Sequence, residues 1–237
     1  MIANSGEYRK KNGQRGCVMM NNFIFENKTK VSFGKGGVKE YLGGLLANFG
    51  ETVMLAYGGG SIKRNGVYDE IMGILNAQGK CVVEFSGIMS NPTYQKVQEG
   101  AKLARENHVD LILAVGGGSV SDCCKVISAQ ANLDEDIWEM QYAKHTLPTK
   151  FIPLGTIVTV FGTGSEMNNG AVITNEEKKI KGALWGAQAE FAFLDPAYSL
   201  SVPMQQVISG AFDTLSHAIE TYFGKPDENN LSDDINE

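Results

Sequence analysis

Short apolar runs alternate with longer amphipathic stretches along this chain, and that alternation is what most constrains its fold. The apolar runs, which are typical of buried strands, lie at 52–57, 81–85, 111–115, 151–153 and 191–194. The stretches at 67–78, 93–107 and 120–130 have apolar residues at helical spacing. Strands and helices that alternate at this rhythm form a parallel sheet with crossover helices. The sequence therefore predicts a Rossmann-like α/β domain.

Two later segments depart from this alternation. Apolar residues at 171–174 and 180–184 flank a polar turn, which predicts a β-hairpin. Pro203 then precedes one long helical pattern at 204–222, and Pro suits the start of a helix. We expect a boundary near Leu200. Residues 1–19 are predicted to be a disordered extension, 20–200 a dinucleotide-binding α/β domain, and 201–237 the start of an all-α metal-binding domain.

Composition narrows the class of protein. The net charge is -6, and an acidic chain argues against nucleic-acid binding, for which a basic stripe is the usual footprint. No apolar run approaches the roughly 18 residues that a membrane span needs. The four cysteines form neither a CxxC pair nor a disulfide framework, which favours a reducing, cytoplasmic compartment.

A Gly-Gly-Gly-Ser segment occurs twice, at 58–61 and at 116–119. Each copy follows a predicted strand and precedes a predicted helix. Ligands of parallel sheets bind at the carboxyl ends of the strands, where glycines let the backbone approach a phosphate and the helix offers free N–H groups. Two matching copies favour phosphate binding, and tight turns are the alternative interpretation.

The end of the first predicted strand bears on the choice of cofactor. No acidic residue stands there to hold the two ribose hydroxyls of NAD. Ser61, Lys63 and Arg64 stand there instead, and a hydroxyl with two cations suits the 2′-phosphate of NADP. An ordinary solvated helix start is the alternative interpretation of Lys63 and Arg64.

A Gly/Thr/Ser-rich loop (FGTGSEMN, 161–168) follows an apolar predicted strand. Hydroxyl and amide groups gather in and beside it, from Thr159, Thr163, Ser165 and Asn168. Such groups suit the pyrophosphate or the nicotinamide amide of a dinucleotide. A hydrogen-bonded turn is the alternative, and composition does not separate the two interpretations.

Asp213 and His217 are four residues apart in the predicted helix 204–222, so they lie on one face and can share a divalent metal. A simple hydrogen-bonded pair is the alternative. His108 and His145 each precede a predicted strand, at the sheet edge opposite the ligand-binding edge. The sequence therefore offers too few donors to complete a metal site, and it offers no convincing general base.

Together these motifs resemble those of the iron-containing (group III) alcohol dehydrogenases. GGGSVSDCCK at 116–125 resembles the family's GGGSxxDxxK segment, GTGSEMN at 162–168 its TGSE loop, and FDTLSHAIETY at 212–222 its metal-binding helix. Asn91-Pro92 fits as well. YGGGSIKRNGVYD and TGSEMN are most similar to the branch of NADP-dependent butanol dehydrogenases.

The resemblance implies reversible NAD(P)H-linked reduction of an aldehyde to a primary alcohol. It assigns the adenosine end to Gly59, Gly60 and Ser61, the ribose to Asn91, and the pyrophosphate to Gly118 and Ser119. It assigns the nicotinamide side to Thr159, Thr163, Asn168 and Lys181, and two of four ligands of Fe²⁺ or Zn²⁺ to Asp213 and His217. Full-length members are expected to be homodimers. We expect this chain to be truncated within the helical domain.

Two alternatives stay open. A relative of glycerol dehydrogenase or dehydroquinate synthase would share the fold plan, although the GTGSEMN loop favours the alcohol dehydrogenases. A nucleotide-binding fragment without catalysis is an alternative of a different class. Metal content and turnover distinguish it from an enzyme.

Overall fold

The computed structural model describes residue 24 and residues 26–223. The predicted extension over residues 1–19 and the segment 224–237 lie outside these described residues. The larger compact unit runs from Asn27 to Phe212, and the described residues from Asp213 onward belong to the other unit. The predicted boundary near Leu200 stays a prediction.

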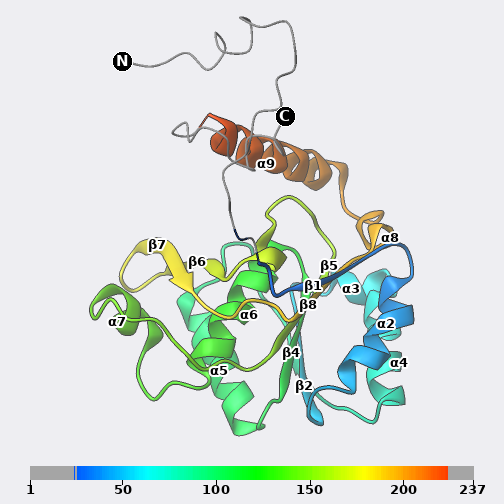
Figure 1. Ribbon diagram of the computed structural model, residues 1–237, viewed down its shortest axis with the longest axis horizontal. Helices are drawn as coiled ribbons and strands as arrows, with labels where there is room; N and C mark the ends of the chain where they lie inside the picture. Colours follow the sequence, from blue (N-terminus) through cyan, green and yellow to red (C-terminus); the bar gives the residue numbers. More distant parts are fainter. Residues whose placement is uncertain (1–23, 25, 224–237) are drawn as a thin grey trace, which may run out of the picture. The chain divides into compact units, whose positions relative to one another are not determined.

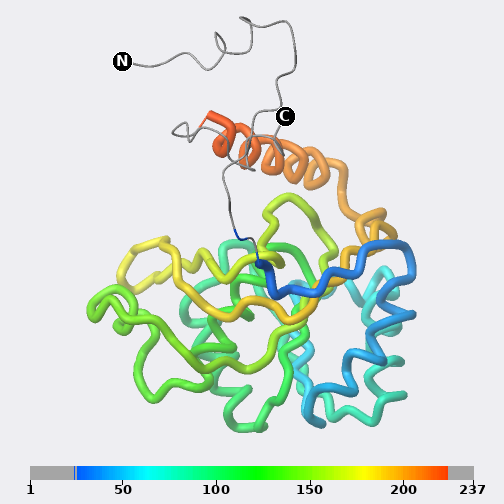
Figure 2. Tube along the Cα trace, in the orientation of Figure 1, coloured from blue at the N-terminus to red at the C-terminus, as the bar shows by residue number. Residues whose placement is uncertain are grey.

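The main sheet has six strands, and it confirms the predicted parallel architecture. Its strands are β1 (Lys30–Phe33), β2 (Thr52–Tyr57), β3 (Cys81–Phe85), β4 (Leu111–Gly116), β5 (Leu154–Val158) and β8 (Phe191–Leu194). Their order is β1-β8-β5-β4-β2-β3, and each neighbouring pair is parallel. Figure 2 shows β1, in blue, alongside the much later β8.

Helices cover both faces of this sheet, because its strands are apolar on both sides. Met54 and Ala56 of β2 belong to the core on one face, whereas Val53 and Leu55 belong to the core on the other. One face carries α5 (Tyr94–Glu106) and α6 (Gly118–Gln130), and the other carries α2 (Gly37–Leu46) and α4 (Val67–Ala77) (Figure 1). Such two-sided burial is what a parallel sheet needs.

The predicted hairpin is confirmed as an antiparallel pair, β6 (Gly170–Asn175) and β7 (Ile180–Trp185). It lies against α6, since Ala171 and Leu184 join the same buried core as Val126. The shorter elements are α3 (Ser61–Arg64), α7 (Ile137–Tyr142), the 3-10 turn η1 (Ser165–Met167) and α8 (Pro196–Ser199). The hairpin therefore extends the core beside α6.

One predicted strand was wrong in its position. The run at 151–153 is not a strand, and β5 begins at Leu154 instead. Pro153 lacks an N–H group and cannot donate within a sheet, although its carbonyl oxygen accepts from the Ile112 N–H at 2.9 Å. The strand β1 and the helices α2 and α7 were not among the predicted elements.

The last described helix, α9 (Met204–Tyr222), begins and ends where its apolar spacing predicts. Its large apolar side chains are exposed, with Phe212 67% and Leu215 51% accessible. Within the described part of the chain, none of the helices is both long and apolar enough to cross a membrane.

Candidate functional site

The candidate site lies at the carboxyl edge of the sheet, where the loops after β2, β4 and β5 meet. The order of the strands places β4 between β5 and β2, so the two glycine loops and the Gly/Thr/Ser loop are neighbours. Thr159 continues directly from β5, and its N–H donates to Gly116 O at 3.0 Å. The edge therefore gathers the three motifs that sequence analysis singled out.

A pocket of about 380 Å³ opens at this edge. Gly117 and Gly118 line it from the start of α6, and the segment 158–164 lines it from the loop after β5. Residues that follow β8, Asp195 and Ser199 among them, close another side. Of the predicted cofactor-binding residues, the pocket lining includes Gly118, Thr159 and Thr163.

The first turn of α6 has the features of an anion-binding helix start. Gly117 precedes the helix and offers no side chain to cap its first N–H groups. Uncapped N–H groups and the positive end of the helix dipole attract a phosphate. Because Gly117 and Gly118 line the pocket, a phosphate there would meet backbone donors with no side chain in between.

The glycines of the two loops differ in what surrounds them. A Cβ atom on Gly59 would meet no atom within 4 Å, so the space beside it is open. A Cβ on Gly118 would lie 2.5 Å from Thr163 Oγ1, and one on Gly116 would lie 2.4 Å from Val120 Cγ2. The second loop therefore needs glycine for its own packing, whereas at Gly59 the packing of the protein does not require it.

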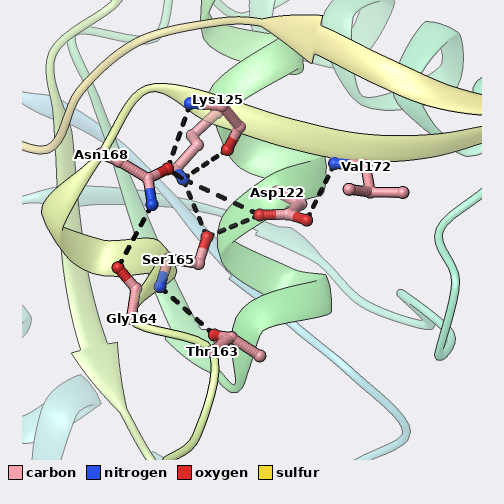
Figure 3. A network of polar contacts seen from close by, with 8 residues as sticks. Asp122, Lys125, Thr163, Gly164, Ser165, Asn168 and Val172 are labelled. Carbon is pink, nitrogen blue, oxygen red and sulfur yellow. Dashed lines mark hydrogen bonds and ion pairs between the residues drawn. The ribbon is translucent and has the colours of Figure 1, made fainter. Parts of the chain in front are cut away.

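Lys125 of α6 is fully buried, and it anchors the loop after β5. Its Nζ atom donates to Ser165 Oγ at 2.8 Å, to Asn168 Oδ1 at 2.9 Å and to Gly170 O at 2.8 Å. Figure 3 shows these contacts converging on the ammonium group. Lys125 thus joins the helix on one side of the pocket to the loop on the other.

Asp122, one helical turn before Lys125, completes this arrangement. Its Oδ1 atom accepts from Ser165 Oγ at 2.5 Å, and its Oδ2 atom accepts from Val172 N at 3.0 Å (Figure 3). We refer to Asp122, Lys125, Ser165 and Asn168 as the loop clamp. Burial lowers the pKa of the Lys125 ammonium to about 8, and the negative charge of Asp122 partly offsets this lowering.

The loop clamp gives a role to Asp122 and Lys125, two residues of the GGGSxxDxxK motif to which sequence reasoning assigned none. Asp122 and Lys125 stand three residues apart in a helix whose other side chains from 120 to 130 are almost all buried. A buried lysine needs partners, because an unpaired buried charge is costly. That spacing of an acid and a lysine within a buried helix was the signal that could have predicted an ion pair.

Two other predicted cofactor residues lie beside each other at the hairpin. Lys181 Nζ of β7 donates to Asn91 Oδ1 at 2.7 Å. Asn91 follows β3 and has a left-handed backbone with φ of 55°.

Asn168 has its Oδ1 occupied by Lys125 and by Gly170 N, so it holds the loop together in this structure. Neither Asn91, Lys181 nor Asn168 lines the pocket.

An acidic residue that sequence analysis missed contacts residues on both sides of the first glycine loop. Glu84, the penultimate residue of β3, accepts from Tyr57 OH and Tyr68 OH, both at 2.6 Å, and from Lys63 Nζ at 3.1 Å. The end of β2 carries no acidic residue, as the sequence indicated. The neighbouring strand β3 nevertheless brings the Glu84 carboxylate into contact with Tyr57, the last residue of β2. The pairing of β2 with β3, which no local motif encodes, was needed to find it.

The predicted metal pair lies within α9. Asp213 Oδ1 and His217 Nε2 are 3.7 Å apart, and both side chains are about half exposed. A carboxylate and an imidazole on one helix face are suitable donors for Fe²⁺ or Zn²⁺. Among residues 24 and 26–223, however, no three potential ligands cluster, so the described residues do not complete a metal site. His108 and His145 precede β4 and β5, at the opposite sheet edge.

This chain is a member of the iron-containing alcohol dehydrogenase family, because residues 28–196 match the model of that family. The match covers the sheet, both glycine loops and the loop clamp. It ends before α9.

Among similar proteins is the probable NADH-dependent butanol dehydrogenase 2 of Bacillus subtilis, which is 43% identical over 217 residues. The match covers 90% of this chain and 55% of that relative. An NADPH-dependent aldehyde reductase of Escherichia coli is 39% identical over 221 residues, again covering 90% and 55%. The chain thus spans about half the length of the curated relatives that it matches.

Solved structures agree with this assignment. The NADH-dependent butanol dehydrogenase A of Thermotoga maritima superimposes with a TM-score of 0.83 at 38% sequence identity. The superposition covers 92% of this chain and 55% of that structure. The fold class predicted from the sequence and the family resemblance are therefore both confirmed.

Proposed function

We propose that this protein takes part in the reversible, NAD(P)H-dependent reduction of an aldehyde to a primary alcohol, as a butanol dehydrogenase does. The observation that carries the proposal is the pocket at the carboxyl edge of the sheet, lined by Gly117, Gly118 and Thr159. In a member of this family, a glycine-lined pocket at a helix start suits a dinucleotide.

In this proposal the described residues bind and orient the cofactor. Gly59, Gly60 and Ser61 face the adenosine end, with Asn91 near the ribose. Gly118 and Ser119 take the pyrophosphate at the start of α6. Thr159, Thr163, Asn168 and Lys181 surround the nicotinamide, the first two from the pocket wall and Asn168 through the loop clamp. The bound nicotinamide supplies the hydride, and the protein supplies its position.

We propose NADPH as the preferred cofactor. Ser61, Lys63 and Arg64 of α3 support this preference, because a 2′-phosphate favours a hydroxyl and cations. Lys63 is already paired with Glu84, which limits the support that it gives. Relatives are described as NADH-dependent in some cases and NADPH-dependent in others, so the test needs both cofactors.

Asp213 and His217 are proposed as two ligands of a divalent iron or zinc ion. Their donor chemistry fits such an ion, and the remaining donors would come from outside the described residues. We further propose that the protein works in the cytoplasm, which the free thiols of Cys81, Cys123 and Cys124 support, and that its full-length form is a homodimer.

The test is butyraldehyde-dependent oxidation of NADPH and of NADH by purified protein supplied with Fe²⁺ or Zn²⁺. The 237-residue chain alone is expected to turn over little. Appending the helical domain of a full-length relative is expected to give turnover that His217→Ala abolishes. His108→Ala is the matched control, since His108 is exposed and precedes β4 at the far edge of the sheet. Cofactor binding without turnover would instead support a nucleotide-binding fragment. Turnover with glycerol and none with butyraldehyde would favour a glycerol dehydrogenase relative.

A further inference from the structure

Glu84 holds three donors at once beside the first glycine loop. Its Oε2 atom accepts from Tyr57 OH and from Lys63 Nζ, and its Oε1 atom accepts from Tyr68 OH. The Lys63 ammonium also lies over both tyrosine rings, 4.3 Å from the Tyr68 centroid and 5.3 Å from that of Tyr57. Lys63 is therefore held on one side by a carboxylate and on the other by two aromatic faces.

This group is part of the same edge as the first glycine loop. Tyr57 ends β2 and is followed at once by the loop, while Lys63 lies in α3, just after it. Glu84 of β3 is opposite Leu55 of β2 in the parallel register, so its side chain reaches Tyr57 and Lys63, which flank the loop, from the neighbouring strand. Lys63, which the sequence suggested as a partner for a 2′-phosphate, is therefore already paired with the Glu84 carboxylate.

We propose that Glu84 weakens the preference for NADP(H) over NAD(H), because it holds the Lys63 ammonium away from a 2′-phosphate and leaves Ser61 and Arg64 to carry that preference. The inference rests on the proposed function, since it takes the first glycine loop as the site of the adenosine end. Glu84 acts through Lys63, so it is a positioning residue.

Electrostatics explains the direction of the effect. Hydrogen bonds from Tyr57 and Tyr68, together with Lys63, lower the pKa of Glu84 to about 2, so the carboxylate is ionised at neutral pH. A phosphate monoester carries a charge of about -1.5 to -2 at pH 7, so it would attract the Lys63 ammonium if Glu84 did not neutralise that ammonium. The unmodified ribose of NAD carries no such charge and gains little from a free ammonium. Removing the charge of Glu84 should therefore favour NADPH selectively.

The experiment compares dissociation constants for NADPH and NADH by calorimetric titration. Glu84→Gln keeps the size of the side chain and removes its charge. We expect the ratio of NADPH affinity to NADH affinity to rise about tenfold, the size of effect that one close charge gives. Glu84→Ala removes the carboxylate by truncation and is expected to shift the ratio the same way. Adding Lys63→Met to Glu84→Gln should cancel most of the gain, because the freed ammonium is then absent.

Glu190 provides a matched control. Its carboxylate lies 3.2 Å from Lys28 Nζ, and this pair is about as exposed as the pair of Glu84 and Lys63. It precedes β8, at the amino edge of the sheet, away from the glycine loops. Glu190→Gln should leave the ratio of the two affinities unchanged.

The outcomes separate this inference from the proposed function. Equal changes for NADPH and NADH in both Glu84 variants would show that Glu84 only supports the fold, and would overturn the inference alone. A gain that survives Lys63→Met would overturn it as well. Failure of the wild-type protein to bind either dinucleotide would overturn the proposed function, and this inference with it.

Discussion

Lys125 Nζ lies 2.8 Å from Ser165 Oγ, a contact that joins α6 to the loop after β5. Lys125→Met is expected to weaken dinucleotide binding by about tenfold or more. Ser165, Asn168 and the Gly170 carbonyl lose a charged donor worth about 1.5–3 kcal/mol each, so the loop is less well positioned. Calorimetric titration with NADPH measures the effect.

Lys102→Met is the control for that substitution. Lys102 lies in α5, is 75% exposed and faces Glu106 at 3.8 Å, so its loss should leave the loop in place. Wild-type affinity in a folded Lys125→Met protein would show that the loop clamp does not position the cofactor site.

Lys125 also predicts a dependence of stability on pH. Its pKa in the folded protein is about 8, below the ordinary value of 10.5, because burial disfavours the ammonium. Between these two values the unfolded chain binds more protons than the folded one, so the contribution of Lys125 to the free energy of unfolding rises with pH. Below pH 8 that contribution is constant and unfavourable to folding.

Denaturant unfolding of the wild type and of Lys125→Met at several pH values from 7 to 10 checks this prediction. The stability of the wild type relative to the variant should increase as the pH rises through 8. A difference that is flat over this range, or that falls, would contradict the assignment of a lowered pKa to Lys125.

The two glycine loops are expected to respond differently to added side chains. Gly59→Val meets no neighbouring atom, so the free energy of unfolding should change by less than about 0.5 kcal/mol while dinucleotide binding falls. Gly116→Val collides with Val120, so it should destabilise the fold by about 1–3 kcal/mol. Unfolding curves and NADPH titrations of both variants provide the comparison. Unimpaired binding by Gly59→Val would mean that no ligand approaches this loop.

Metal binding by residues 1–237 alone is expected to be weak. Asp213 and His217 supply two donors 3.7 Å apart, and two donors leave an ion mostly hydrated. Equilibrium dialysis against Zn²⁺ should give substoichiometric binding that Asp213→Ala removes, with Asp69→Ala in α4 as the control. A tightly held, stoichiometric ion would mean that further donors complete the site.

Much of the fold could be predicted because most of its strands and helices have a clear pattern in their own local sequence. The bounds of β2, β3, β8 and α9 follow directly from apolar period and from flanking glycine or proline. β5 was misplaced because Pro153 and its apolar neighbours resemble a strand. The helix α2, in contrast, lacks a side-chain N-cap and contains two adjacent glycines, which weaken its local signal.

Of the candidate site, only the loops that carry a recognisable sequence motif could be predicted. The loops at Gly118 and Thr163 were found from sequence, and the structure brings them to one pocket. The roles of Lys125 and Glu84 were not found, because each depends on a partner 20 or more residues away along the chain. Such contacts follow from the order of strands in the sheet and from the path of the loop, and neither is encoded near the residue itself.

The central claim is that a dinucleotide lies at this edge of the sheet, and a crystal structure of the protein with NADPH or NADH tests it most directly. We predict that the pyrophosphate contacts the backbone N–H groups at Gly118 and Ser119 at the start of α6, with the nicotinamide beside Thr159 and Thr163. A dinucleotide bound elsewhere on the protein would contradict the account. So would a pocket that stays empty at saturating concentrations of both cofactors.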